Sequence, residues 1–189
     1  MNKRLCVVFA ALMAVPGALL GQDKPQSQAA PSANPITASE KGLYSFVSGA
    51  VIAAAQKMPE ENYSFKPTPE VRSFGQIVGH VADANYMFCA LGSGEPNPNK
   101  GIEKAKTSKA DLVTALKDAV AYCNKAYDGM TDAKGSQMAK FMSFDLAKLT
   151  MFSLNTAHTD EHYGNIVTYL RIKGIVPPTS ENPPPQAAK

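Results

Sequence analysis

Apolar residues recur at intervals of three and four positions along four segments of this 189-residue chain, with polar residues between them. This spacing places apolar side chains on one face of a helix, whereas strict alternation would indicate a strand. The helices are predicted at residues 37–58, 73–91, 108–128 and about 143–173. On the first helix the buried stripe is predicted to comprise Leu43, Phe46, Val47, Ala50, Val51 and Ala54. No convincing strand alternation or internal repeat is visible, so the pattern predicts an all-α protein.

The predicted helix ends carry local signals. Thr37 with Glu40, and Ser73 with Gln76, have the spacing of a capping box, in which each side chain bonds a backbone amide left free in the first turn. Glycine closes the later helices, because it adopts the left-handed conformation that often ends a helix. The closing glycines are Gly92, Gly129 and Gly174.

Four amphipathic helices in one chain favour a four-helix bundle. The predicted connections are about 14 to 16 residues long, which exceeds the usual loop of an up-and-down bundle. Segment 92–101, rich in Gly, Pro and Asn, is long enough to climb the side of the bundle, which would make the second and third helices parallel. The expected fold is an all-α four-helix bundle with a long crossover between helices 2 and 3.

Cys89 and Cys123 each lie about one turn from the C-terminal end of their predicted helix. Parallel helices bring the two residues to the same height and permit a disulfide, whereas antiparallel helices joined by a tight turn do not. An even pair in an oxidising compartment also favours a disulfide. The alternative is two buried free thiols that pack as small apolar side chains.

The chain begins with the features of a secretory signal peptide. Lys3 and Arg4 precede an apolar run from Leu5 to Val15, which is too short to span a bilayer. Cleavage is predicted after Gly21, with Ala18 as a competing site and an uncleaved membrane anchor as the alternative. The predicted parts are a signal peptide at 1–21, a disordered linker at 22–36, the bundle at 37–178 and a disordered tail at 179–189. The mature protein is expected in the periplasm or outside the cell, unattached to a membrane.

Charge argues against nucleic acid as a partner. Without Lys3 and Arg4, the 19 basic residues become 17, against 16 acidic ones. Nucleic-acid binding depends on clustered Lys and Arg, and this near-neutral chain has no such cluster. A phosphate-binding glycine loop, a CxxC pair and an HExxH motif are also missing from the sequence.

The three histidines are the candidate chemistry. His158 and His162 are four residues apart, so they share one helix face, and His80 lies on a second predicted helix that can face them. Three imidazoles can hold one divalent ion, with Zn, Ni or Fe favoured by the ligand type. Three protein ligands leave a position for water or substrate, as in catalytic sites.

Polar residues near the histidines are candidates to orient them or a substrate. Asp83 lies one turn after His80, and Asn155 one turn before His158, where each can accept from a ring N–H. Asn155 and Tyr169 share a face with the histidine pair and can orient a substrate. Asp160 and Glu161 point elsewhere, to solvent or a neighbouring helix.

Three motifs resemble the DinB-like (DinB/YfiT) superfamily of metal-dependent four-helix-bundle proteins. They are Gly79-His80, Asn155-Thr-Ala-His158-Thr-Asp-Glu-His162-Tyr-Gly-Asn165 and Tyr169-Leu-Arg-Ile-Lys-Gly174, and the resemblance spans 37–178. It implies a bundle with a crossover between its second and third helices and a divalent ion held by His80, His158 and His162. The chain departs from the family pattern at Asn165, where glutamine is commoner.

Superfamily members include S-transferases that use low-molecular-weight thiols. Those thiols are cytoplasmic, so the predicted export of this protein argues against that activity. The resemblance therefore implies a metal-dependent hydrolase or a thiol S-transferase-like enzyme acting on a small molecule. The alternative is a non-catalytic metal- or ligand-binding module, and either could form a homodimer through an apolar helix face.

Overall fold

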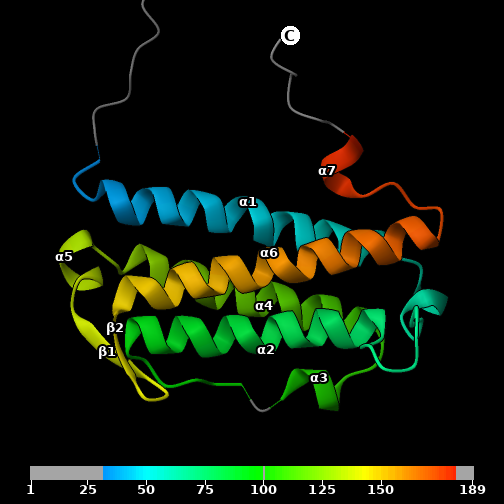
Figure 1. Cartoon of the computed structure of the whole chain (residues 1–189), viewed down its shortest axis with the longest axis horizontal. Coiled ribbons are helices and arrows are strands. Elements are labelled where there is room, and N and C mark those ends of the chain that lie inside the picture. The colour runs from blue at the N-terminus through cyan, green and yellow to red at the C-terminus, as the bar shows by residue number, and fades with distance from the viewer. Residues whose placement is uncertain (1–31, 100, 182–189) are drawn as a thin grey trace, which may run out of the picture. The chain divides into compact units, whose positions relative to one another are not determined.

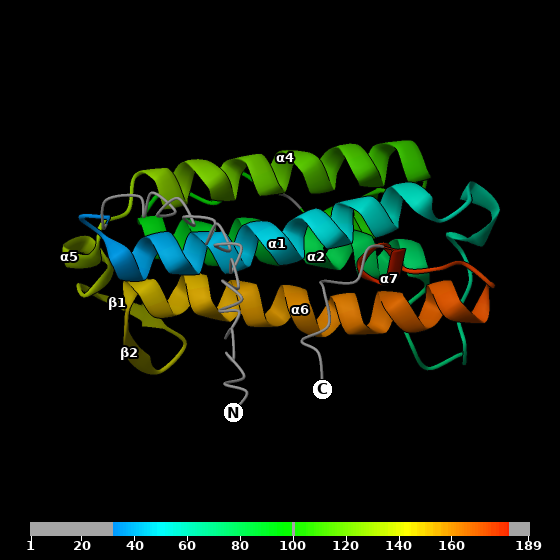
Figure 2. The ribbon, with the colours of Figure 1, turned by 90° about the horizontal axis from the view of Figure 1, so that it is seen from above.

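The computed structural model describes residues 32–99 and 101–181. Four long helices pack side by side as a bundle: α1 (Pro35–Lys57), α2 (Phe74–Ser93), α4 (Lys109–Asp128) and α6 (Lys148–Ile172) (Figure 1). Within the bundle, α2 packs against both α4 and α6, and α1 covers α4 and α6 from the other side (Figure 2). The predicted four-helix bundle is confirmed.

The connection from α2 to α4 is a long crossover. It returns along the outside of α2 and carries the short helix α3 (Ile102–Ala105), so that α2 and α4 run in the same direction (Figure 1). Cys89 and Cys123 consequently lie at the same height, are fully buried, and are joined by a disulfide. The linked predictions of crossover and disulfide are both met in the structure.

One of the two predicted capping boxes forms. Ser73 Oγ accepts from the Gln76 amide at 3.2 Å, and Gln76 Oε1 accepts from the Ser73 amide at 2.8 Å. The predicted box at Thr37 is wrong, because α1 already begins at Pro35 and Thr37 lies inside it. The Thr37 hydroxyl instead donates to Asp132 of the short helix α5 (Asp132–Gly135), which ties that helix to the start of α1.

A hairpin replaces the first turn predicted for the last long helix. Strands β1 (Met138–Phe141) and β2 (Phe144–Ala147) pair antiparallel, and α6 begins only at Lys148. No residue of either strand is buried, and neither MAKF nor FDLA alternates strictly between apolar and polar residues, so the sequence lacks the pattern of a half-buried strand. The hairpin contacts the bundle through Phe141, whose ring lies 5.8 Å from that of Phe88.

The inward face of α1 is partly different from the predicted stripe. Tyr44, Val47 and Val51 are buried, whereas Leu43 and Phe46 are 62% and 70% exposed. An apolar residue on a helix surface satisfies the same spacing as a buried one, so spacing alone placed these two side chains wrongly.

Three short elements complete the described residues: the 3-10 helix η1 (Glu60–Asn62), α5 and the terminal helix α7 (Pro178–Glu181). Helix α1 begins two residues earlier than the predicted bundle and so includes Pro35 and Ile36 of the predicted linker. Helix α7 includes the first residues of the predicted tail. The predicted signal peptide lies outside the described residues. Within 32–99 and 101–181, no helix combines the length and apolar character needed to cross a bilayer.

Candidate metal centre

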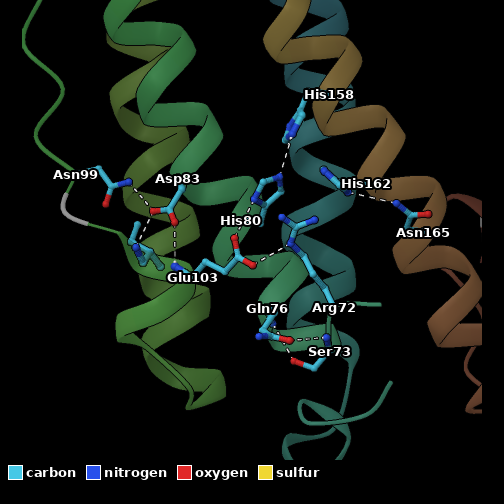
Figure 3. Close-up of polar contacts among 11 residues, drawn as sticks. Arg72, Ser73, Gln76, His80, Asp83, Asn99, Glu103, His158, His162 and Asn165 are labelled. Atoms are coloured by element: carbon cyan, nitrogen blue, oxygen red, sulfur yellow. Dashed lines mark hydrogen bonds and ion pairs between the residues drawn. The ribbon is translucent and has the colours of Figure 1, made fainter. Parts of the chain in front are cut away.

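The three histidines converge between α2 and α6. Their candidate ligand nitrogens all lie within 4.8 Å of one another. His80 Nε2 is 3.2 Å from His158 Nε2, and the His158 and His162 ring centroids are 4.4 Å apart (Figure 3). The i and i+4 spacing on α6 sets the second pair, and the packing of α2 on α6 brings in His80.

This donor set fits a divalent ion. Two imidazole nitrogens bound to one tetrahedral zinc ion are roughly 3.3 Å apart, because each bond is about 2.0–2.1 Å long. The separation of 3.2 Å between His80 and His158 matches that geometry. Among the described residues, no Cys, Asp or Glu joins the three histidines in this cluster.

Glu103 of α3 orients His80. Its Oε2 lies 3.0 Å from His80 Nδ1, and its Oε1 accepts from Arg72 Nε at 2.9 Å (Figure 3). Partial burial alone would raise the pKa of Glu103, but the bonds from Arg72 and His80 outweigh it and hold the pKa below its usual value. An ionised carboxylate keeps the proton of His80 on Nδ1, which leaves Nε2 free to bind an ion.

Asp83 does not contact His80 as predicted; it holds α3 in place. Its carboxylate accepts from the backbone amides of Ile102 at 2.7 Å and Glu103 at 3.0 Å. Gly79 permits this close packing, since a Cβ there would lie 2.7 Å from Glu103 Cα. Asp83 therefore acts on His80 only through Glu103. The sequence analysis missed Glu103 because its contact with His80 depends on where the crossover returns.

The two imidazoles on α6 stay uncharged near neutral pH. Burial, and then the neighbouring His162 and His80 rings, lower the pKa of His158 to about 4. The pKa of His162 is also lowered, mainly by burial. Neutral imidazole is the form that binds metal.

The second ring nitrogens of these histidines have different surroundings. His158 Nδ1 is buried and takes no hydrogen-bond partner among the described residues, so packing holds this ring, with Phe88 at 5.8 Å between centroids. His162 Nδ1 lies 3.3 Å from the Asn165 amide nitrogen. If Nε2 of His162 binds an ion, Nδ1 carries the proton, and a half-turn of the Asn165 amide presents the oxygen that accepts it.

Asn155 points away from the three histidines, contrary to the prediction that it orients their rings or a substrate. It is fully buried, and its amide nitrogen donates to Asn85 Oδ1 at 3.2 Å and approaches the sulfurs of Cys89 and Cys123 at 3.6 Å. Helical spacing places Asn155 near His158 along α6, but the side chain faces the bundle core.

A polar cleft of about 680 Å³ opens beside the cluster. His162 and Tyr169 line it, as do Arg72, Glu103, Glu161 and Asn165. The Tyr169 hydroxyl donates to the backbone carbonyl of Arg72 at 2.6 Å, so this predicted substrate-orienting group is already engaged in holding the cleft wall. The cleft gives a small molecule access to the histidine side of the bundle.

Both the sequence and the fold of this chain are similar to those of known proteins. A sequence profile of the DinB superfamily matches residues 44–166. A DinB-like protein from Bacillus cereus is similar in structure, with a TM-score of 0.66, 13% identity, and coverage of 75% of this chain and 95% of the other. A DinB-like protein from Bacillus subtilis has a TM-score of 0.61, 18% identity, and coverage of 72% and 92%. No curated protein sequence matches the chain.

Proposed function

The chain belongs to the DinB superfamily, and on that premise we propose that it binds one divalent metal ion through His80, His158 and His162 and acts as a metal-dependent hydrolase on a small molecule. The observation that carries the proposal is the convergence of the three imidazoles beside a cleft. Imidazole ligands suit zinc, nickel and iron.

The site has the features of a reactive centre rather than a closed structural one. A divalent ion held there by three neutral ligands would supply a bound water of pKa ~7 and a Lewis acid for a substrate oxygen. The protein's own part is to hold the rings: Glu103 fixes the tautomer of His80, and burial keeps His158 and His162 uncharged. The exposed carboxylate of Glu161 also lines the cleft.

We also propose that the protein acts in the cell envelope. The basic and apolar start of the sequence supports export, and so does the Cys89–Cys123 disulfide, because disulfides persist in oxidising compartments. This location favours hydrolysis over transfer to a cytoplasmic thiol.

Metal analysis tests the ion. Protein purified without nickel resin is expected to hold one divalent ion per chain, and His158→Ala and His162→Ala are expected to hold almost none. Asp160→Ala is the matched control, since this exposed residue lies between the two histidines on α6. Circular dichroism checks that each variant is folded. Equal metal content in the histidine variants and the control would rule out the proposed site.

Turnover tests the activity. The metal-loaded protein is expected to hydrolyse members of a panel of small esters, lactones and amides, and the histidine variants are expected to be inactive. Stoichiometric metal with no turnover on any of these bonds would instead favour the non-catalytic metal- or ligand-binding module.

A further inference from the structure

The guanidinium of Arg72 is held at the edge of the cleft with its two terminal nitrogens unused. Its Nε donates to Glu103, but no described residue accepts from either Nη group. Figure 3 shows the side chain extending from the segment just before α2 towards His80 and His162. The Arg72 side chain is 43% exposed, so the unused nitrogens are accessible to a ligand.

Arg72 is positioned from both ends. The Tyr169 hydroxyl holds its backbone carbonyl at 2.6 Å, and Glu103 Oε1 holds its Nε at 2.9 Å. Glu103 is in turn bonded to His80 through its other oxygen. One carboxylate therefore sets the spacing between the guanidinium and the histidine cluster. A guanidinium held in this way loses little conformational entropy when it binds an anion.

The charge near Arg72 also favours an anion once an ion is present. Three neutral imidazoles leave the full charge of a divalent ion uncompensated, and the positive charge of Arg72 lies on the wall of the same cleft. Three carboxylates also line the cleft: Glu103 is paired with Arg72 and His80, and the charges of Glu70 and Glu161 are screened by solvent, as is that of the exposed Lys66.

We propose that the substrate carries an oxyanion, a carboxylate or a phosphate, which pairs with the two Nη groups of Arg72 while its reacting group faces the three histidines. The inference rests on the proposed metal site and adds the class of substrate. The fork of N–H groups matches two oxygens of one anion, which gives both affinity and a fixed orientation.

Calorimetric titration of the zinc-loaded protein with small probes tests this recognition. Malonate and phosphonoacetate each offer one anionic group for the ion and another for Arg72, and malonamide is the neutral analogue. Wild type is expected to bind at least one of the two anions and not malonamide. Arg72→Gln is expected to weaken anion binding about 10- to 100-fold. The tighter anion identifies the preferred oxyanion, and either preference supports the inference.

Two controls separate recognition from structure. Arg171→Gln makes the same charge change at an exposed position near the end of α6, and should bind like wild type. Arg72→Lys keeps the positive charge but loses the fork of N–H groups, so it should bind the anions more weakly than wild type. Equal affinity in Arg72→Gln and Arg171→Gln, or wild-type affinity in Arg72→Lys, would overturn the inference.

Zinc content measured on the same samples separates the two proposals. If the protein holds a full complement of zinc but Arg72→Gln does not change anion affinity, the proposed substrate class is wrong and the proposed metal site stands. A wild-type protein that holds no ion removes the metal site, and the inference with it.

Discussion

Helices α2 and α6 hold two polar clusters that differ in what surrounds them. The histidine cluster consists of His80, His158 and His162. The asparagine–disulfide cluster lies nearby and joins residues of α2 and α6 to residues of α1 and α4: Tyr44, Asn85, Asn155 and the Cys89–Cys123 disulfide. Asn85 follows His80 by five residues, and Asn155 precedes His158 by three. Sequence spacing alone therefore does not distinguish the candidate functional cluster from the structural one.

The asparagine–disulfide cluster is closed by helices on every side. Tyr44 of α1 donates to Asn85 Oδ1 at 2.6 Å, and Cys123 of α4 approaches the Asn85 carbonyl at 3.2 Å. All its members are at most 1% exposed. Buried polar groups that bond one another in this way specify how the helices dock, and they have no room for a substrate.

The histidine cluster is bordered instead by the crossover and by the segment before α2. The His80 side chain is 25% exposed, and its partners Glu103 and Arg72 come from these connections rather than from the long helices. These connecting segments place charged side chains and an open cleft beside the histidines, whereas long helices would have covered them. The difference teaches that the covering segments decide which polar cluster of this bundle is accessible to a small molecule.

The largest expected effect comes from removing the disulfide. The variant Cys89→Ala with Cys123→Ala should lose about 3–4 kcal/mol of unfolding free energy, because the bond closes a loop between residues 34 apart. Urea unfolding measures the loss. Zinc content should stay at the wild-type level, and a parallel loss of zinc would show that the two clusters do not act independently.

The next effect is a pH dependence confined to the histidine cluster. The pKa of His158 is lowered to about 4 in the folded protein. Between pH 4 and the ordinary pKa that this histidine has in the unfolded chain, the unfolded chain therefore binds more protons than the folded protein. The metal-free protein should therefore lose stability as the pH falls below the unfolded pKa, by about 2 kcal/mol at pH 5, and the loss from this residue should level off as the pH falls through about 4.

Urea unfolding of metal-free wild type and His158→Gln at pH 7 and pH 5 measures that term. The variant should lose less stability between the two pH values, by about 2 kcal/mol. Identical pH dependence in the two proteins would contradict the burial of a neutral imidazole at this position.

The smallest expected effect tests the link from the crossover to the histidines. Gly79→Ala puts a Cβ against the backbone of Glu103, so α3 must move and the bond from Glu103 to His80 must weaken. Zinc affinity should fall about tenfold, the lower end of the range for partners of metal ligands. A competition titration with a zinc chelator measures this change.

Gly164→Ala is the control for that variant. Gly164 lies in α6 beside the histidine pair, and a Cβ there meets nothing within 4 Å. This change should leave zinc affinity unchanged and raise helix stability by up to about 1 kcal/mol. Equal zinc affinity in the two alanine variants would argue against a role for α3 in holding the ion.

Local patterns predicted much of the fold. Spacing of three and four identified all four long helices, Ser73 and Gln76 formed the predicted box, and the length of segment 92–101 indicated the crossover. Local patterns failed where a distant contact decides the outcome. The hairpin at 138–147 packs on Phe88, and the burial of Leu43 and Phe46 depends on which face of α1 meets the bundle.

The sequence by itself determined the bundle and the three histidines, because helical periodicity and the i and i+4 pairing of His158 with His162 are properties of neighbouring residues. Only the tertiary structure decided that Glu103 holds His80, that Asp83 and Gly79 place Glu103, and that Asn155 belongs to the core. Those contacts join helices to a crossover, and their geometry is set by how whole segments pack, which no local spacing encodes.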